Sequence, residues 1–182
     1  MKYLLELPYL CYQRKLNYNT MVTIPIEERE FIEGTIRSCK ECFVGMIDTE
    51  GFPYVIPMNF GYKNDVVYLH SGPEGNAIRS LTQNPNVCIT FCTDSEITHQ
   101  NEEVACSYRV RGSSVICKGK VDFVEDFEEK VNILDILMEQ YSDQKFKYSD
   151  PAVRNVKVWK VEIEKVSGRL FGVPYKESHQ YK

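Results

Sequence analysis

Hydrophobic and polar residues alternate along six segments of the chain, and this alternation predicts six β-strands. The pattern is clearest in residues 156–168, where Val and Ile alternate with charged residues. The other five predicted strands are CFVGMID, PYVIPMNFGY, DVVYLH, NVCITFCTD and SVICKGKVDFV. Gly51 in the turn TEG joins the first two of these as a hairpin, and a tight turn at residues 62–64 precedes the third. We therefore expect these three strands to form a meander.

Three further segments have helical spacing. The first begins near Ile24, with Pro25 at its start and acidic residues in its first turn. A short helix is expected over residues 74–81, ended by Asn84–Pro85, and a long helix with a broad apolar face over residues 125–141. Because these helices interrupt the strands instead of alternating with them, we expect an α+β, mainly β fold built on a six-stranded antiparallel barrel.

The length of 182 residues fits one domain with a full core. We expect this domain over residues 23–175, with an N-terminal extension at residues 1–22 and a C-terminal tail at residues 176–182. The opening sequence MKYLLELPYLCYQRKL is interrupted by Glu6 and Pro8 and is followed by no small-residue cleavage site, so no signal peptide is predicted. No apolar stretch approaches the roughly 20 residues of a membrane span, so no membrane association is expected.

Charge and cysteine content narrow the function further. The net charge is -4 and the 22 Lys and Arg are scattered, so we expect no nucleic-acid partner. The 7 Cys are an odd number that fits no secreted disulfide framework, which predicts reduced thiols and a cytoplasmic protein. Cys39 and Cys42 have the C-x-x-C spacing of redox sites and half zinc sites, but no second Cys or His pair stands at a matching distance. We therefore predict no metal site.

The stretch YLHSGPEGNAI, residues 68–78, joins a predicted strand to a predicted helix through a glycine turn. A helix that begins there points unpaired backbone N–H groups and its positive end at the turn, which favours an anion such as phosphate. Ser71 adds a hydroxyl, Gly72 and Gly75 allow a ligand to approach the backbone, and Arg79 lies one turn into the helix. The stretch is not a P-loop, because the Gly-Lys-Ser/Thr ending is missing.

The motifs around this stretch occur in a specific order. They are a glycine-turn hairpin, VIPMNFGY, a strand ending in His-Ser, Glu-Gly, NPNVC, SSVI, a helix with Glu-Glu-Lys, and a final Gly with a basic residue. From about Ile24 to Arg169 the chain resembles the flavin-binding split-barrel family of pyridoxamine 5'-phosphate oxidase. Within that family it is most similar to the branch that includes the 5-nitroimidazole resistance proteins.

This resemblance implies a six-stranded split barrel that forms a homodimer, with two FMN molecules in clefts at the subunit interface. It implies that Pro57, Met58, Asn59 and Phe60 lie along the flavin ring, largely through backbone groups. The family's cofactor chemistry asks little of the side chains, because the flavin performs the electron transfer and the protein supplies position and electrostatics.

The resemblance also assigns contacts at the other end of the cofactor. It places His70 and Ser71 near the ribityl chain and phosphate, and Gly75 and Asn76 at the phosphate itself. The histidine is a candidate catalytic residue that donates a proton or holds the phosphate; alternatively, it only caps the loop by hydrogen bonding.

Four residues of the last two predicted strands complete the implied site. Ser114 and Val115 contact the cofactor from the fifth strand, and Trp159 or Arg169 reaches it from the partner chain. For Trp159 two interpretations stand beside each other, a ring that stacks on the flavin and a ring that belongs to the core or the subunit interface.

The chain departs from the family at the phosphate. Relatives usually carry two basic residues after the Glu-Gly glycine, where this chain has Asn76 and Ala77. Each missing charge-assisted bond is worth about 1.5 to 3 kcal/mol, which weakens FMN binding by about tenfold to a hundredfold unless Arg79, Arg109 or Arg111 substitutes. The family also contains members that bind haem or a deazaflavin.

Taken together, the sequence predicts a cytoplasmic, homodimeric, FMN-dependent oxidoreductase. It is expected to pass electrons from a reduced nicotinamide, through flavin, to a small acceptor such as a nitroimidazole or another nitro-aromatic compound. The alternative is a non-catalytic protein that stores or senses a flavin or a haem, which the weakened phosphate site favours.

Overall fold

The computed structural model describes residues 21–181, and within this range the chain forms nine strands and four α-helices. The strands are β1 (Met21–Ile26), β2 (Cys42–Ile47), β3 (Pro53–Met58), β4 (Gly61–Lys63), β5 (Val66–Ser71), β6 (Asn86–Cys92), β7 (Glu96–Thr98), β8 (Arg109–Val124) and β9 (Lys157–Pro174). The helices are α1 (Arg29–Ser38), α2 (Asn76–Gln83), α3 (Phe127–Glu139) and α4 (Asp150–Asn155), with 3₁₀ turns at η1 (Ala105–Ser107) and η2 (Tyr175–Tyr181).

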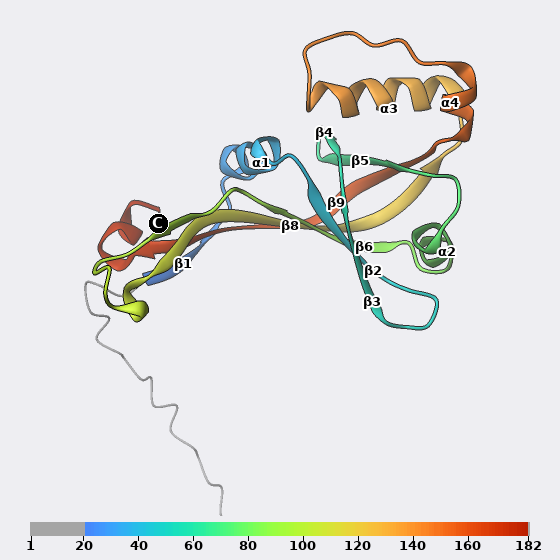
Figure 1. Cartoon of the computed structure of the whole chain (residues 1–182). Coiled ribbons are helices and arrows are strands. Elements are labelled where there is room, and N and C mark those ends of the chain that lie inside the picture. The colour runs from blue at the N-terminus through green and yellow to red at the C-terminus, as the bar shows by residue number, and fades with distance from the viewer. Residues whose placement is uncertain (1–20, 182) are drawn as a thin grey trace, which may run out of the picture.

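All strand pairings are antiparallel, and the main path of the sheet runs β3-β2-β6-β8-β9-β5-β4. The short strands β1 and β7 pair with β9 and β8 respectively. Figure 1 shows β8 and β9 running the length of the molecule, with β1 and η2 at one end and α3 and α4 at the other. The expected mainly β, antiparallel split-barrel fold is thus confirmed.

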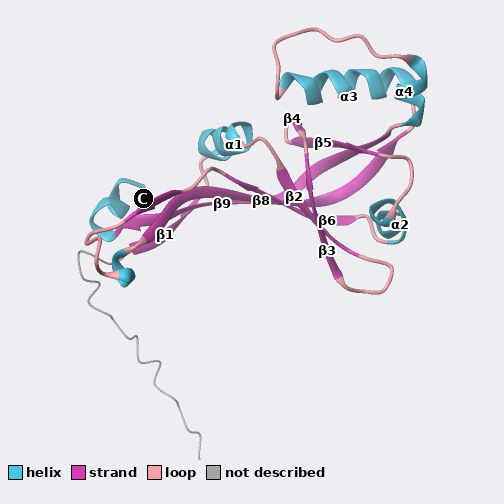
Figure 2. Cartoon of the chain, in the orientation of Figure 1, coloured by secondary structure: helices cyan, strands magenta, loops and turns pink. Residues whose placement is uncertain are grey.

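The main core fills the concave side of this curved sheet. Its largest fully buried side chains include Trp159, Phe60 and Phe91, and α1 and α2 add Ile36 and Leu81. The helices lie around the sheet and do not alternate with its strands (Figure 2). A second cluster lies between α3 and the far side of β5, β8 and β9, and a third joins β1 to β9. We call the side of the sheet that faces the main core the inner face and the opposite side the outer face.

The first helix begins later than the sequence pattern indicates. Residues 21–26 form β1, in which Ile24 and Ile26 pair with Leu170 and Gly168 and are buried. Pro25 therefore lies in a strand and does not start the helix, which begins at Arg29. A proline is tolerated there because β1 is an edge strand, paired only with β9.

The predicted meander is present, but its second strand is divided in two. The first part, β3, pairs with β2, and the last part, β4, pairs with β5, which also pairs with β9. Asn64 and Asp65, both at positive φ, make the turn from β4 to β5, which is the geometry of a two-residue hairpin turn. The segment at residues 59–60 thus carries the chain from one edge of the sheet to the other, which curls the sheet into a barrel.

The expected domain limits can be compared with the secondary structure at both ends of the described chain. The first 20 residues of the expected N-terminal extension lie outside the described residues, and Met21 and Val22 belong to β1. Residues 176–181 of the expected tail belong to η2, which begins one residue earlier, at Tyr175. Lys182 lies outside the described residues. Within residues 21–181, no helix is both long and apolar enough to cross a membrane.

Candidate functional site

Strand alternation divides the residues expected at the cofactor between the two faces of the sheet. Across the strands, Pro57 pairs with Phe43, Phe43 with Thr90, and Thr90 with Ile116 on the outer face. Since alternate residues of a strand share a face, Ser114 belongs to this face, and its partner Arg169 does too.

By the same rule, Met58, Val115 and Trp159 point inward; the latter two are fully buried. The sheet therefore offers a ligand the outer-face residues and not the inner ones.

The end of β5 separates His70 from Ser71 in the same way. The Ser71 hydroxyl accepts a hydrogen bond from Trp159 Nε1 at 3.2 Å and donates one to the Gly72 carbonyl at 2.8 Å. His70 pairs with Val158 and exposes its ring on the outer face. Partial removal from water lowers the pKa of His70, so the neutral imidazole is favoured near pH 7 although one side of the ring remains wet.

The ring of Trp159 is held entirely within the protein. It is 0% exposed, packs edge-on to Phe123 with ring centroids 6.1 Å apart, and gives its N–H to Ser71. The structure therefore places Trp159 in the core of its own chain, which leaves no free face for stacking on a flavin, here or in a partner. Of the two residues expected to reach a neighbouring cofactor, Arg169 alone is exposed.

The helix that follows the glycine turn has an uncapped N-terminus. Its N-cap residue, Gly75, lies at φ 140° and provides no side-chain hydrogen bond, and the first turn of α2 contains no acidic residue. A Cβ atom placed on Gly75 would meet nothing within 4 Å, so the space in front of the turn is open. The free N–H groups and the helix dipole make this the best anion site among the expected residues. Asn76 is half-buried and Arg79 is exposed at this helix.

The loop after β3 makes more hydrogen bonds and packing contacts within the protein than the sequence analysis expected. The Phe60 N–H donates to the hydroxyl of Tyr141 at 2.9 Å, and the Phe60 ring packs edge-on to Phe91 with centroids 4.8 Å apart. Asn59 Nδ2 donates to the Lys40 carbonyl, at 3.4 Å. The N–H and ring of Phe60 are therefore not free for a ligand, whereas Pro57 is exposed on the outer face.

Of the arginines that sequence reasoning offered as substitutes at the phosphate, Arg109 is engaged elsewhere. Its Nε donates to Thr98 Oγ1 at 2.9 Å, which ties β8 to β7. Arg79 is exposed on α2. The backbone N–H of Arg79 donates to the Gly75 carbonyl at 3.1 Å, which places this arginine one helical turn from the glycine.

The outer face contains an apolar surface that the sequence analysis missed. Phe43 and Ile47 of β2 are each 41% exposed, and Val55 of β3 is 59% exposed. Their inward neighbours in β2, such as Val44, are buried in the main core. A signal was available, because CFVGMI and PYVIPM are apolar at both alternating sets of positions, as expected for strands covered on both faces.

The cysteines whose pKa values are raised most are buried and do not belong to this surface. Burial raises the pKa of Cys42 and of Cys117 to about 12, and it also raises the pKa of Cys39. Within residues 21–181, no three His, Cys, Asp or Glu side chains are grouped so that they could hold a metal ion. The C-x-x-C thiols are therefore protonated and buried near neutral pH, which does not suit redox exchange.

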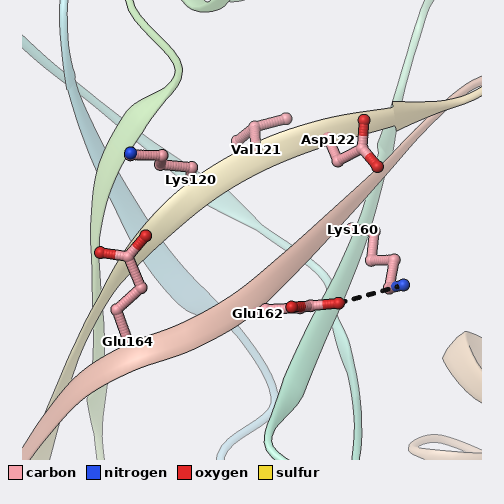
Figure 3. Close-up of a pocket in the computed structure, with 6 residues that line it drawn as sticks. All are labelled: Lys120, Val121, Asp122, Lys160, Glu162 and Glu164. Carbon is pink, nitrogen blue, oxygen red and sulfur yellow. Dashed lines mark ion pairs between the residues drawn. The ribbon is translucent and has the colours of Figure 1, made fainter.

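One mixed-charge pocket of about 260 Å³ lies on the outer face of β8 and β9 (Figure 3). It is lined by Lys120, Val121, Asp122, Lys160, Glu162 and Glu164, none of which the sequence analysis singled out. In it Lys160 and Glu162 form an ion pair at 3.3 Å.

Comparison with known proteins places most of the chain in one family. The family model described as pyridoxamine 5'-phosphate oxidase matches residues 28–170. No protein of curated function matches the sequence significantly. Among solved structures, a candidate 5-nitroimidazole antibiotic resistance protein from Bacteroides thetaiotaomicron VPI-5482 is 54% identical, with a TM-score of 0.77. The match covers 84% of this chain and 90% of that one.

More distant structures share the fold alone. The flavocytochrome Anf3 from Azotobacter vinelandii is 17% identical with a TM-score of 0.71, over 86% of this chain and 75% of that one. The FAD and haem binding protein from Mycobacterium smegmatis is 14% identical, also with a TM-score of 0.71, over 86% of this chain and 78% of that one. On the family match and the 54% identity, the chain belongs to the pyridoxamine 5'-phosphate oxidase family of split barrels, in the branch of the 5-nitroimidazole resistance proteins.

Proposed function

We propose that this protein is a cytoplasmic FMN-binding oxidoreductase that reduces a small acceptor, such as a nitroimidazole or another nitro-aromatic compound. The observation that carries the proposal is the 54% identity, over 84% of the chain, to a candidate 5-nitroimidazole antibiotic resistance protein. The site supports it, because an uncapped helix N-terminus stands directly after the strand that holds His70. A flavin phosphate suits such a terminus.

FMN, when bound, supplies the electron and hydride transfer, and the protein supplies position and electrostatics. In this proposal the N–H groups at the start of α2 hold the phosphate, with Arg79 as the nearest cation of that helix. Pro57 and Ser114 face the cofactor from the outer side of the sheet, and Arg169 reaches it from the partner chain. The side chains of Phe60, Val115 and Trp159 act from behind, as the packed core that keeps these strands in place.

His70 is the proposed catalytic residue. It stands on the outer face next to the glycine turn, and its lowered pKa keeps the imidazole largely neutral near pH 7. In that state the ring can accept a proton at one nitrogen and donate one at the other. It can therefore pass a proton to a reduced acceptor from one nitrogen while it takes a proton from water at the other, so that the ring stays neutral.

We further propose that two copies associate through the outer face. Phe43, Ile47 and Val55 form an exposed apolar surface on β2 and β3, and such contiguous surfaces mark interfaces in folded proteins. A second copy is the occupant that the family membership supports. It would cover this surface and enclose the ligand-facing residues of the sheet between the two chains.

A reduction assay tests the activity. Protein loaded with FMN would be mixed with a reduced nicotinamide and a 5-nitroimidazole, and the loss of the nitro absorbance would be followed without oxygen. We expect nitroimidazole-dependent oxidation of the nicotinamide by the loaded protein, above the rate with free FMN alone. No turnover with either nicotinamide donor would count against the proposal.

The second candidate is a non-catalytic protein that stores or senses a flavin or a haem. The observation that favours it is the absence of a basic residue at Asn76 and Ala77, directly after Gly75. Two structures with the same fold are a flavocytochrome and an FAD and haem binding protein. A haem absorption band in the purified protein, or bound flavin that no donor reduces, would support this candidate.

A further inference from the structure

The outer face of β8 and β9 carries an unbalanced pair of cations. Lys118 and Lys165 are direct partners in the antiparallel register, and both are exposed. They line one shallow pocket of about 190 Å³, together with Ile116, Val166 and Ser167. No carboxylate within residues 21–181 lies at ion-pair distance from either ammonium group. Like charges directly opposite each other destabilise a sheet, so this pair works against folding.

A bulge keeps the nearest acidic residue out of this pair. The register of β8 and β9 shifts after Lys118, where Gly119 pairs with Ile163 and Glu164 is left without a partner. Glu164 instead lines the neighbouring pocket of Figure 3, on the same side as Lys120. Bulges are frequent beside active sites, where they redirect side chains. Here the bulge leaves Lys118 and Lys165 facing each other.

The cations continue along the face on both sides of the pair. Lys120 follows on β8, and Arg169 lies four residues from Lys165 on β9, a distance of about 13 Å along a strand. Among the described residues, neither has an ion-pair partner, in contrast to Lys160, which pairs with Glu162 in Figure 3. Lys120 stands directly opposite Glu162 in the register, so the strip of net positive charge consists of Lys118, Lys165 and Arg169, a surface suited to an anion.

The strip adjoins the proposed cofactor surface. From Lys118 and Lys165, the next outer-face pairs are Ile116 with Ser167 and then Ser114 with Arg169, the last being proposed cofactor contacts. The turn at Gly75 is remote from the strip, because Ser71 pairs with Lys157 and Lys165 lies eight residues further along β9, about 26 Å. The strip can therefore hold a phosphate group only of a second ligand, at the Ser114 and Arg169 end of the proposed cofactor surface.

We propose that Lys118 and Lys165 bind a phosphate group of a ligand of this site. The inference rests on the proposed function, and the phosphate belongs to the diphosphate of the nicotinamide donor, because the single phosphate of FMN is proposed at the start of α2. Two charge-assisted hydrogen bonds from opposed lysines relieve their mutual repulsion, so binding and the stability of the pair are coupled.

A direct test uses the protein without cofactor and inorganic pyrophosphate as the probe, by calorimetry at low ionic strength, where surface charges are least screened. The variant carries Lys118→Gln with Lys165→Gln. The matched control carries Lys145→Gln with Lys147→Gln, two exposed lysines of the loop between α3 and α4. We expect the variant to lose at least tenfold in pyrophosphate affinity and the control to retain it. Equal affinity in all three proteins, or none in the unaltered protein, would overturn the inference.

Two further measurements on the same variants test the donor as the ligand. We expect a raised KM for the nicotinamide donor, with kcat and the FMN dissociation constant retained. An unchanged KM, or a weaker FMN dissociation constant in its place, would overturn the inference. Loss of all turnover in the unaltered protein would refute the proposed function while leaving the pyrophosphate result intact.

The competing explanation is that a second copy of the chain neutralises the lysines with its own carboxylates. Sedimentation of the same variants separates the two explanations. If the lysine variant shifts the balance between monomer and dimer and its pyrophosphate affinity is unchanged, the proposal is wrong.

Discussion

At the scale of single residues, the end of β5 gives two neighbouring polar residues different roles. The hydroxyl of Ser71 points inward and is held by Trp159, whereas the imidazole of His70 points outward and has no hydrogen-bond partner among the described residues. A strand turns successive side chains to opposite faces. The outward histidine is therefore the group of this pair that can reach a ligand.

Replacement of His70 tests its catalytic role. His70→Asn keeps a polar side chain but removes the titrating imidazole, so we expect kcat for nitroimidazole reduction to fall by about a hundredfold or more, the range of general acid–base catalysis. FMN affinity should change little. His99→Asn, in the exposed segment after β7, is the matched control and should retain the unaltered rate. A His70→Asn enzyme with normal kcat would remove the residue from the mechanism.

The same histidine makes stability depend on pH. Because burial lowers its pKa in the folded chain, while the unfolded imidazole titrates near about 6.5, the unfolded chain binds the proton more readily. The contribution of His70 to stability is therefore lost as the pH falls through the unfolded value. Urea unfolding at pH 7.5 and 5.5 should show a larger loss for the unaltered protein than for His70→Asn. Equal losses would contradict the shift.

Thiol reactivity should divide the cysteines by burial. With a pKa of about 12, Cys42 and Cys117 are ionised to about one part in ten thousand at pH 8. Cys92 and Cys106 are exposed. Iodoacetamide labelling of the folded protein, read by peptide mass, should modify the exposed pair first and the buried pair only after unfolding. Rapid labelling of Cys42 in the folded protein would contradict this order.

At the scale of elements, the C-terminus of α3 fastens two turns of the barrel. The hydroxyl of Tyr141 donates to the Lys40 carbonyl at 2.9 Å and accepts from the Phe60 N–H at 2.9 Å. Gln140 Nε2 donates to the carbonyls of Arg37 and Cys39. These contacts connect the chain before β2 to the chain after β3, so α3 stabilises the strands that carry Pro57.

Tyr141→Phe should weaken this link. The substitution leaves the Phe60 N–H without its acceptor, and we expect the free energy of unfolding to fall by about 1–3 kcal/mol. Tyr148→Phe is the control, because its hydroxyl bonds only the exposed Asp135 carboxylate and its loss should cost less. Denaturant unfolding of both variants measures the difference. Equal stability of the two variants would show that the hydrogen bonds of the Tyr141 hydroxyl do not contribute to stability.

The start of α2 offers a gain-of-function test. Restoring a cation with Asn76→Lys places an ammonium group at the uncapped terminus, and one charge-assisted bond should tighten FMN by about tenfold or more. Ala77 is a poorer position because its side chain packs against the main core. Fluorescence titration of FMN compares Asn76→Lys with Asn76→Gln. Unchanged affinity in the lysine variant would move the phosphate away from α2.

The sequence predicted elements better than their pairing. The long strands show a clear period of two, but β4 and β7 contain three residues each, too few for any period to appear. Pro25 and the acids after it resemble a helix start, although Ile24 and Ile26 belong to a strand. The second partner of β5, besides β4, is β9, about 90 residues later in the chain, and no local turn signal encodes that pairing.

The site was likewise predictable where it depends on local sequence and unpredictable where it depends on strand pairing. The glycine turn and the helix after it follow from local sequence, and the structure contains both. The burial of Trp159 depends on its pairing with Leu69 of β5 and Phe123 of β8, both distant in sequence. The opposed lysines could not be foreseen without the pairing.

At the scale of the whole molecule, the outer face is unlike an ordinary solvent-exposed sheet. It carries apolar residues on β2 and β3, and the opposed lysines Lys118 and Lys165 on β8 and β9. Both features are costly in a single chain in water. They fit a protein whose outer face is covered by a second copy and by an anionic ligand.

Val55→Asp tests the proposed dimer. Val55 is 59% exposed in the single chain, so the change should leave folding intact but place a charge in the interface. We expect the dissociation constant of the dimer, measured by sedimentation over a dilution series, to rise at least tenfold above that of the unaltered protein. Ile97→Asp, on β7 and 68% exposed, is the matched control. An equally stable dimer in both variants would place the interface elsewhere.

The central claim is that this family member binds FMN, and one measurement tests it most directly. The absorption spectrum of the protein would be recorded immediately after purification and again after addition of FMN, and any released ligand would be identified by mass. We predict flavin absorption bands and the mass of FMN. A colourless protein that takes up no added FMN, or a haem band in place of the flavin bands, would contradict the account.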